Sequence, residues 1–322
     1  PDVLRYGYIC DIFGHTAQMP QILRKSGIRG ALLGRGTNYH TTPAHFRWQS
    51  PDGSECITFK VPEECGYGTF WMDTWLQRFL SGGGEKELLA DACGYVERER
   101  GRSDLPYVVL MDGMDHEGIH DGAPWLAAQL SEAYGCPVVF RPMSELPEEL
   151  EEYLDEMPVR RGELIETACK VVEHNMLIPY TLSSRYDLKK ANDLCQVLLE
   201  KWAQPLQAAT GLSGCPISAG FLREAYRQLI QNHAHDSICG CSIDAVHRDM
   251  HYRFRQSQQI SYEIIQDALN RLYVLTEGEG SDTRRLVIFN PLPFEREELV
   301  TVELWFQPGY PHQFCEQGKD QM

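Results

Sequence analysis

The chain has 322 residues, of which 43% are hydrophobic and 24% are charged, as in a globular protein that can bury a sizeable core. Its formal net charge of -16 argues against nucleic acid and anionic membrane surfaces as partners, because both select basic proteins, and it favours a neutral substrate. The sequence has no apolar run near the roughly 18 residues of a membrane span.

The eleven cysteines are odd in number and scattered, and Cys10 and Cys195 lie inside apolar runs. This pattern favours free thiols in a reducing compartment over a disulfide framework, so we expect a cytoplasmic protein. The first residues, Pro1 to Val3, lack the basic and apolar regions of a secretion signal. The chain starts without methionine, inside a strand pattern, and we therefore expect a piece of a longer protein.

Residues 1–158 alternate short apolar runs with segments of helical pattern. The expected strands are Tyr6–Cys10, Gly30–Leu33, Ile57–Val61, Tyr107–Met111 and Pro137–Phe140. The expected helices are Ala17–Ser26, Thr69–Phe79, Glu85–Glu99 and Ala123–Ala133. Such alternation is typical of βαβ units, so we predict a partial α/β catalytic domain with a largely parallel sheet wrapped by helices.

The pattern changes after residue 158. Three long helices are expected at 188–209, 219–232 and 243–273, and they predict a three-helix bundle over residues 159–278. After a glycine-containing break, apolar runs at 286–293 and 299–306 predict the first strands of a C-terminal β-sandwich domain over residues 284–322. Two strands alone do not form a stable sheet, so we expect this domain to be truncated.

Two carboxylates follow expected strands. Asp11 ends the first apolar run, just before a turn at Gly14, and Asp115 follows the run Tyr107–Met111. Carboxylates at the ends of strands of one sheet can converge on a single substrate, one as nucleophile and the other as general acid/base. The alternatives stay open, because Asp11 could be a helix N-cap, and Asp112 or Glu117 competes with Asp115.

A histidine and an aspartate stand next to each other far downstream. His235 and Asp236 lie between two expected helices and are ligands of the kind that a divalent metal, most often zinc, prefers. His233 and His235 are too close in sequence to share one helix face, and either could be a structural histidine. From spacing alone, the chain is an α/β hydrolytic enzyme whose metal dependence is open.

Residues 11–28 (DIFGHTAQMPQILRKSGI) resemble the nucleophile segment of family 38 glycoside hydrolases, the class II α-mannosidases. Residues 233–247 (HAHDSICGCSIDAVH) resemble that family's second metal-binding segment. Similar landmarks follow in the family's order at 161–164 (RGEL), 184–192 (SRYDLKKAN) and 289–296 (FNPLPFER). The resemblance covers essentially the whole chain and implies a barrel-like, incomplete catalytic domain.

The resemblance also implies roles for individual residues. Asp11 would be the catalytic nucleophile and a metal ligand, His235 a second ligand of the same Zn²⁺ ion, and Asp115 the general acid/base. The substrate is expected to be a carbohydrate, an α-mannoside. Four further residues would contact the sugar. Asp236 would hydrogen-bond the sugar hydroxyls, Phe13 would pack against the sugar ring, and Arg35 and Tyr67 would also belong to the substrate site.

The chain departs from the family in one respect. Two further metal ligands of the family belong to a His-x-Asp segment on the first strand of the domain, which would precede Pro1. With only two protein ligands, we expect this chain to bind metal weakly and to be inactive, or nearly so, by itself.

The leading interpretation is a metal-dependent retaining α-mannosidase that acts through a covalent glycosyl-aspartate intermediate. A mannosylglycerate-type hydrolase of the same family is the alternative, and the motifs do not separate the two. A polysaccharide deacetylase, which would not require Asp115, and a sugar-binding module without turnover are further alternatives. The sequence leaves the formation of a homo-oligomer open.

Overall fold

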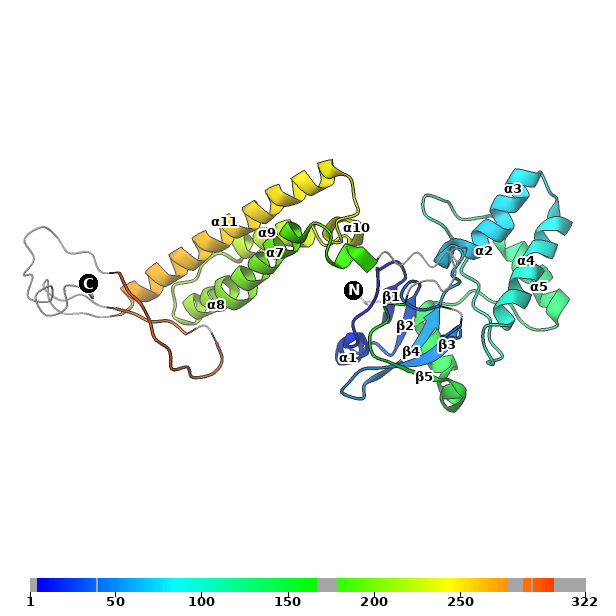
Figure 1. Cartoon of the computed structure of the whole chain (residues 1–322), viewed down its shortest axis with the longest axis horizontal. Coiled ribbons are helices and arrows are strands. Elements are labelled where there is room, and N and C mark those ends of the chain that lie inside the picture. Colours follow the sequence, from blue (N-terminus) through cyan, green and yellow to red (C-terminus); the bar gives the residue numbers. More distant parts are fainter. Residues whose placement is uncertain (1–4, 39, 167–178, 277–285, 291, 304–322) are drawn as a thin grey trace, which may run out of the picture. The chain divides into compact units, whose positions relative to one another are not determined.

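The computed structural model describes residues 5–38, 40–166, 179–276, 286–290 and 292–303 (Figure 1). The chain forms two compact units, which are described separately. Unit 1 comprises residues 1–190 and 230–252, and unit 2 comprises residues 191–229 and 253–322. All residues of the predicted site belong to unit 1.

Unit 1 is built on a five-stranded sheet of order β1-β2-β4-β3-β5. The strands are β1 (Tyr6–Ile9), β2 (Gly30–Leu33), β3 (His45–Gln49), β4 (Glu55–Lys60) and β5 (Val159–Arg161). The pairs β1–β2, β2–β4 and β3–β5 are parallel, whereas β3 and β4 are antiparallel. The sheet is mixed because β3 and β4 are joined by a tight turn. In this turn the Ser50 N–H donates to the Ser54 carbonyl at 2.9 Å.

The expected strands match β1, β2 and β4, whereas two expectations are wrong. Residues Tyr107–Met111 and Pro137–Phe140 form no strand. Val109 and Met111 still pack against a buried cluster that includes Tyr6 and Phe59, so a short apolar run indicated burial without a strand. The strands β3 and β5 were not predicted. Closure of the sheet into a barrel stays a prediction, since β1 and β5 are the edges of the described sheet.

The helices of unit 1 agree with the expected positions. They are α1 (Met19–Lys25), a continuous segment formed by α2 (Thr69–Trp71), η2 (Met72–Leu76) and α3 (Gln77–Ser81), then α4 (Glu85–Arg100) and α5 (Ala123–Tyr134). Shorter helical turns are η1 (Gly66–Gly68), η3 (Met143–Glu145), α6 (Leu146–Glu149), η4 (Glu151–Glu156), η5 (Pro179–Leu182) and α10 (His235–Ile238). The apolar faces of η2, α4 and α5 share one cluster, which contains Trp75, Leu88 and Leu126.

Three parallel strands end at the same edge of the sheet. The register pairs Ile9 of β1 with Leu33 of β2, and Leu33 with Lys60 of β4. The residues that follow these strands therefore meet, and Gly34 comes so close that a Cβ there would lie 2.3 Å from the Cys10 carbonyl oxygen. Ligands of α/β proteins bind at this edge, beyond the carboxyl ends of parallel strands.

Unit 2 is helical in its described part. The helices α7 (Tyr186–Gln196), η6 (Val197–Ala203), α8 (Gln204–Leu212), α9 (Ala219–Ile230) and α11 (Asp244–Val274) cover the three expected helices, although α7 and α11 begin in unit 1. One apolar cluster joins residues of η6, α8 and α11, including Leu198, Leu206 and Ile264, with Leu222 of α9 at its margin. The bundle itself stays a prediction.

Residues 286–290 and 292–303 contain no strand, although strands were expected over 286–293 and 299–306. A strand forms only where another strand accepts and donates its backbone hydrogen bonds, and the described residues offer none to this segment. Residues 304–322, and with them most of the expected β-sandwich, lie outside the described residues. None of the described helices is long and apolar enough to cross a membrane.

Candidate active site

A pocket with a cavity volume of about 160 Å³ lies at the carboxyl ends of β1, β2 and β4. This volume is below the roughly 300–1,000 Å³ of sites that enclose a drug-sized ligand, so the pocket suits a small group. Its walls come from the segments after the three strands and from the loop around Asp115. The lining residues are Cys10, Asp11, Gly34, Arg35, Pro62, Glu63, Cys65, Gly66, Tyr67, Met114 and Asp115.

Asp11 follows β1 and is held by Arg35, which follows β2. The Arg35 Nε–H donates to Asp11 Oδ1 at 2.8 Å, and the Nη2 nitrogen contacts the same oxygen. The guanidinium also lies over the ring of Phe13, with Cζ 4.6 Å from the ring centroid. A charge-assisted bond and a cation–π contact therefore fix Arg35 beside the carboxylate.

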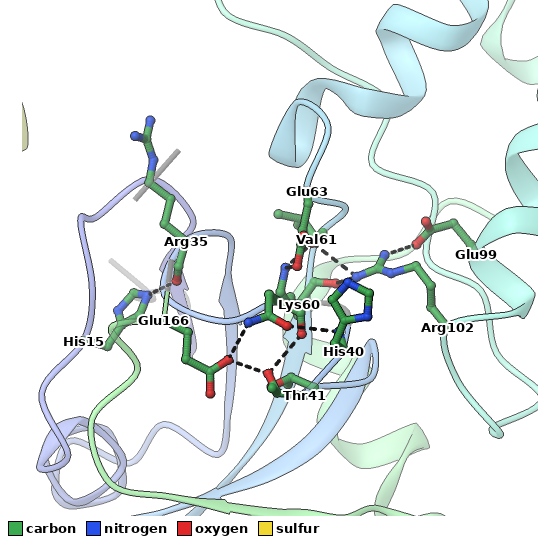
Figure 2. A network of polar contacts seen from close by, with 12 residues as sticks. His15, Arg35, His40, Thr41, Lys60, Val61, Glu63, Glu99, Arg102 and Glu166 are labelled. Carbon is green, nitrogen blue, oxygen red and sulfur yellow. Dashed lines mark hydrogen bonds and ion pairs between the residues drawn. The ribbon is translucent and has the colours of Figure 1, made fainter. Parts of the chain in front are cut away.

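The backbone of Arg35 is fixed as well (Figure 2). The buried His15 lies with Nε2 3.0 Å from the Arg35 carbonyl oxygen, so this nitrogen carries the proton and donates. Burial lowers the pKa of His15 to about 4, and the ring is neutral at pH 7. Gly36 has φ of +95°, and a Cβ there would lie 2.2 Å from the Leu164 carbonyl oxygen. Glycine is therefore required where the backbone at residue 36 passes the backbone at Leu164.

His235 begins the short helix α10 and reaches Asp11. Its Nε2 lies 2.9 Å from Asp11 Oδ2, the carboxylate oxygen that Arg35 does not contact. The His235 ring also lies 5.8 Å from the ring of Phe13, at an angle of 56°. The exposed Asp236 lies next to it, with Oδ1 3.5 Å from His235 Nε2.

Basic residues of the segment around α7 hold the end of α10. The Lys189 ammonium donates to the carbonyl oxygens of Ser184 at 2.6 Å, Ile238 at 2.9 Å and Cys239 at 3.3 Å. Arg185 Nε–H donates to the Gly240 carbonyl at 3.2 Å. Because the last carbonyls of a helix lack partners within the helix, these donors stabilise the segment that carries His235.

Asp115 lies on the opposite wall, in an exposed loop. The Tyr67 hydroxyl donates to Asp115 Oδ1 at 2.9 Å. Burial, together with this hydrogen bond and the nearby carboxylates, raises the pKa of Tyr67, so the hydroxyl keeps its proton. Asp11, Arg35, Tyr67 and Asp115 therefore line one pocket, while Phe13, His235 and Asp236 adjoin it through Asp11 and Arg35.

A buried group of charges, which the sequence analysis missed, supports the wall that follows β4 (Figure 2). The ammonium group of Lys60, a fully buried residue, lies 3.2 Å from Glu63, and Arg102 donates to the carbonyls of Lys60 at 2.9 Å and Val61 at 3.3 Å. Burial lowers the pKa of Lys60 to about 8. In the sequence these charges look like surface residues, and only the fold places Arg102 beside the end of β4.

The pair Asp11 and His235 fits a divalent metal as two of its ligands. Carboxylate oxygen and imidazole nitrogen are donors that zinc accepts, and the two atoms already lie 2.9 Å apart. Over the described parts of the chain, no three His, Cys, Asp or Glu side chains are arranged to hold one ion. The described residues would therefore supply two of the four protein ligands that such an ion commonly takes.

Comparison with known proteins decides the family. The sequence pattern described as "Glycosyl hydrolases family 38 N-terminal domain" matches residues 2–134, and "Alpha mannosidase middle domain" matches residues 180–272. The chain belongs to glycoside hydrolase family 38. The family 38 N-terminal match includes Asp11, Arg35, Tyr67 and Asp115, and the middle-domain match includes His235.

Individual relatives agree with the family 38 assignment. A protein of Halalkalibacterium halodurans named "Putative mannosylglycerate hydrolase" is 30% identical over 283 residues, which cover 78% of this chain and 28% of the relative. An α-mannosidase structure from Enterococcus faecalis V583 has a TM-score of 0.70 at 24% identity and covers 85% of this chain and 30% of that chain. A second family 38 structure from Enterococcus faecalis has a TM-score of 0.61 at 22% identity, with 85% and 27% coverage. These structures support the fold of the family 38 chain, which spans under a third of each relative's length.

Proposed function

We propose that the protein carrying this chain is a metal-dependent retaining α-mannosidase. The observation behind the proposal is that Asp11 and Asp115 line the same pocket, while His235 contacts Asp11. Retaining glycosidases use two carboxyl groups, one as nucleophile and one as general acid/base, about 5–5.5 Å apart. The pocket provides one carboxylate that is paired with Arg35 and one on a loop that faces it.

In this mechanism Asp11 attacks the anomeric carbon and forms a glycosyl-aspartate bond. Arg35 fixes Oδ1 of Asp11 by a charge-assisted hydrogen bond, so Oδ2 is the oxygen that is directed towards the sugar and His235. Asp115 protonates the leaving oxygen, and it then removes a proton from the water that hydrolyses the intermediate. Because Oδ1 of Asp115 accepts from Tyr67, Oδ2 is the oxygen proposed to carry the proton.

The metal proposed for this site is one divalent cation, with zinc as the first candidate. Asp11 and His235 would hold it, together with ligands from outside the described residues or water. When bound, such an ion supplies a positive charge that orients sugar hydroxyls and favours an ionised carboxylate. Phe13 is proposed to pack against the sugar ring, and the exposed Asp236 to accept hydrogen bonds from its hydroxyls.

A mannosylglycerate-type hydrolase is the second candidate. It is favoured by the relative from Halalkalibacterium halodurans, whose printed name gives that substrate. Both candidates share the chemistry of the mannose unit and differ in the group that leaves.

The test is hydrolysis of an aryl α-mannoside and of α-mannosylglycerate by the full-length protein, with and without added zinc. We expect zinc-dependent release that Asp11→Ala abolishes and Asp115→Ala reduces by about 10²–10⁴-fold. If Asp115→Asn left release of acetyl groups from an acetylated polysaccharide intact, a deacetylase would replace the glycosidase. Binding of mannose without turnover by the metal-loaded protein would indicate a sugar-binding module.

We further propose a reducing, cytoplasmic setting for the protein. The nine described cysteines are free, and two of them, Cys56 and Cys195, are buried. Burial raises the pKa of the Cys56 thiol to about 11, so the thiol stays protonated and unreactive. Unchanged mobility of the protein after thiol alkylation with and without prior reduction would agree with this setting.

A further inference from the structure

Two tryptophans hold the loop that carries Asp115, one on each side of that residue. The Trp75 indole N–H donates to Asp112 Oδ1 at 2.9 Å, on the side before Asp115. The Trp71 indole N–H donates to His120 Nε2 at 2.7 Å, on the side after it. Both donors belong to the helical segment that runs from Thr69 to Ser81.

Both indoles belong to a packed core, so their positions are fixed. Trp75 is 7% exposed and lies in the cluster of η2, α4 and α5, and Trp71 packs against the same cluster. The His120 ring stacks on Trp75, with centroids 4.6 Å apart and an interplanar angle of 9°. The chain also passes close to the indole at Gly122, where a Cβ would lie 3.0 Å from the Trp75 ring.

The loop between the two anchors has little other support. Residues 115–119 are exposed, and Ile119 is 98% exposed. Tyr67, which immediately precedes the same helical segment, supplies the described hydrogen bond to Asp115 itself. Residues 67–75 therefore contact the loop through hydrogen bonds at Asp112, Asp115 and His120, and Gly68 lies against Met114. These contacts hold the part of the loop that carries the carboxyl group.

We propose that Trp71 and Trp75 are positioning residues for proton transfer, acting through His120 and Asp112 to hold Asp115 at the distance that protonation of the leaving group requires. This inference rests on the proposed function, in which Asp115 is the general acid. Neither indole lines the pocket. Proton donation needs a heavy-atom separation of about 2.6–3.2 Å, and misplacement by about 1 Å can cost a hundredfold in rate.

The test replaces the two acceptor residues, because neither of them belongs to the apolar cluster of η2, α4 and α5. Asp112→Ala and His120→Phe each remove one acceptor, and the phenyl ring keeps the stacking on Trp75. Asp112→Asn keeps an acceptor oxygen, and His120→Gln replaces the acceptor nitrogen by an acceptor oxygen, so the two serve as matched conservative variants. Each variant of the full-length protein is assayed on two α-mannosides, one with a dinitrophenyl leaving group that departs without a proton and one with an alkyl leaving group that needs it.

The expected result is a selective loss. Asp112→Ala and His120→Phe should lower kcat/KM, which reports the departure of the leaving group, by about 10–100-fold for the alkyl mannoside but by less than about threefold for the dinitrophenyl mannoside. Asp112→Asn and His120→Gln should restore most of the loss. In hydrogen exchange, the amides of residues 112–121 should exchange faster in the first two variants than in the conservative ones.

Asp115→Asn is measured beside them to separate the two possible failures. If Asp115→Asn shows the selective loss and the acceptor variants do not, the anchoring inference is overturned and the proposed function stands. If Asp115→Asn lowers kcat/KM equally for both mannosides, Asp115 is not the acid, and both the role proposed for it and the inference fall. Equal slowing of both mannosides in the acceptor variants indicates a structural role alone and also overturns the inference.

Discussion

Asp11 Oδ2 lies 2.9 Å from His235 Nε2, although 224 positions separate the two residues in the sequence. Asp11 follows the strand β1, and His235 begins the helix α10, to which the chain returns after leaving unit 1. A neutral imidazole with Nδ1 protonated would direct its Nε2 lone pair at the same point as the carboxylate oxygen. In this arrangement the two side chains would serve as a pair of ligands for the proposed metal.

The first prediction follows from this pair and concerns His235→Ala. Removal of Nε2 leaves Asp11 as the remaining donor of the described pair, so we expect zinc affinity to fall by more than the roughly 10–100-fold that loss of an outer-shell partner costs. Isothermal titration of the chain with zinc measures the change. His233→Ala, two positions away, is the control and should leave affinity unchanged. Equal affinity of His235→Ala and the parent chain would contradict the assignment of His235 as ligand.

The second prediction concerns Gly36→Ala. Gly36 has φ of +95°, and a Cβ there would lie 2.2 Å from the Leu164 carbonyl oxygen, whereas Gly53 has φ of +86° and a Cβ there would meet nothing within 4 Å. Gly53→Ala should therefore cost only backbone strain, about 1 kcal/mol, while Gly36→Ala adds a clash and should cost roughly 2–4 kcal/mol. Urea unfolding measures both variants.

The same two variants test the positioning of Arg35, the residue next to Gly36. Relief of the clash at Leu164 requires the backbone after β2 to move, and Arg35 would move with it away from Asp11. Mannoside turnover per folded molecule should fall about tenfold or more in Gly36→Ala and stay unchanged in Gly53→Ala. Full turnover in a folded Gly36→Ala protein would show that the close approach of the Gly36 and Leu164 backbones does not set the position of Arg35.

The sequence predicted the part of the sheet that carries the site, and it did so for a physical reason. Strands β1, β2 and β4 are short apolar runs, and their carboxyl ends are marked by Asp11, Gly34 and Lys60. Strand β3 was missed although Phe46 and Trp48 are fully buried and alternate with polar residues, which is the period-two signal of a strand. That signal was available in the sequence and could have been used.

The supporting contacts could not be predicted in the same way. His120 and Asp112 are polar residues in an exposed loop, and nothing in their spacing indicates that Trp71 and Trp75 donate to them. The error at Tyr107–Met111 has a related cause, because an apolar run specifies burial but the strand depends on a hydrogen-bonding neighbour. Long-range contacts between side chains follow from packing, which a single sequence does not reveal.

The third prediction concerns pH. His15 and His45 are buried, and burial lowers the pKa of each to about 4 from an ordinary value of 6.5. Between these values the unfolded chain binds protons that the folded chain excludes, so stability is fully present above pH 6.5 and falls as the pH drops towards 4. Each histidine should contribute up to about 3 kcal/mol to this loss.

Urea unfolding of His15→Gln at pH 7 and pH 4.5 tests this prediction. The glutamine amide can still donate to the Arg35 carbonyl but does not titrate, so the variant should lose about 2 kcal/mol less stability over this range than the parent chain. His116→Asn, a change at an exposed histidine, is the control and should follow the parent. Parallel pH dependence of the parent and His15→Gln would mean that His15 takes up its proton in the folded state as easily as in the unfolded one.

The fourth prediction concerns Lys189. Its ammonium group donates to three carbonyl oxygens, two of which, from Ile238 and Cys239, lie at the end of α10. Lys189→Met keeps the apolar stem of the side chain and removes all three donors, so the helix that carries His235 should lose its fixed position. We expect zinc affinity to fall by about 10–100-fold, as for other groups that orient a metal ligand.

Lys190→Met is the matched control, because Lys190 is an exposed neighbour on the same helix. Calorimetry gives the zinc affinity, and hydrogen exchange of the amides of residues 235–241 reports the order of α10 without any assay of activity. Faster exchange together with weaker binding in Lys189→Met alone would place Lys189 among the residues that orient His235. Unchanged affinity with faster exchange would instead mean that Asp11 orients His235 by itself, because the 2.9 Å contact between them would then persist without a fixed α10.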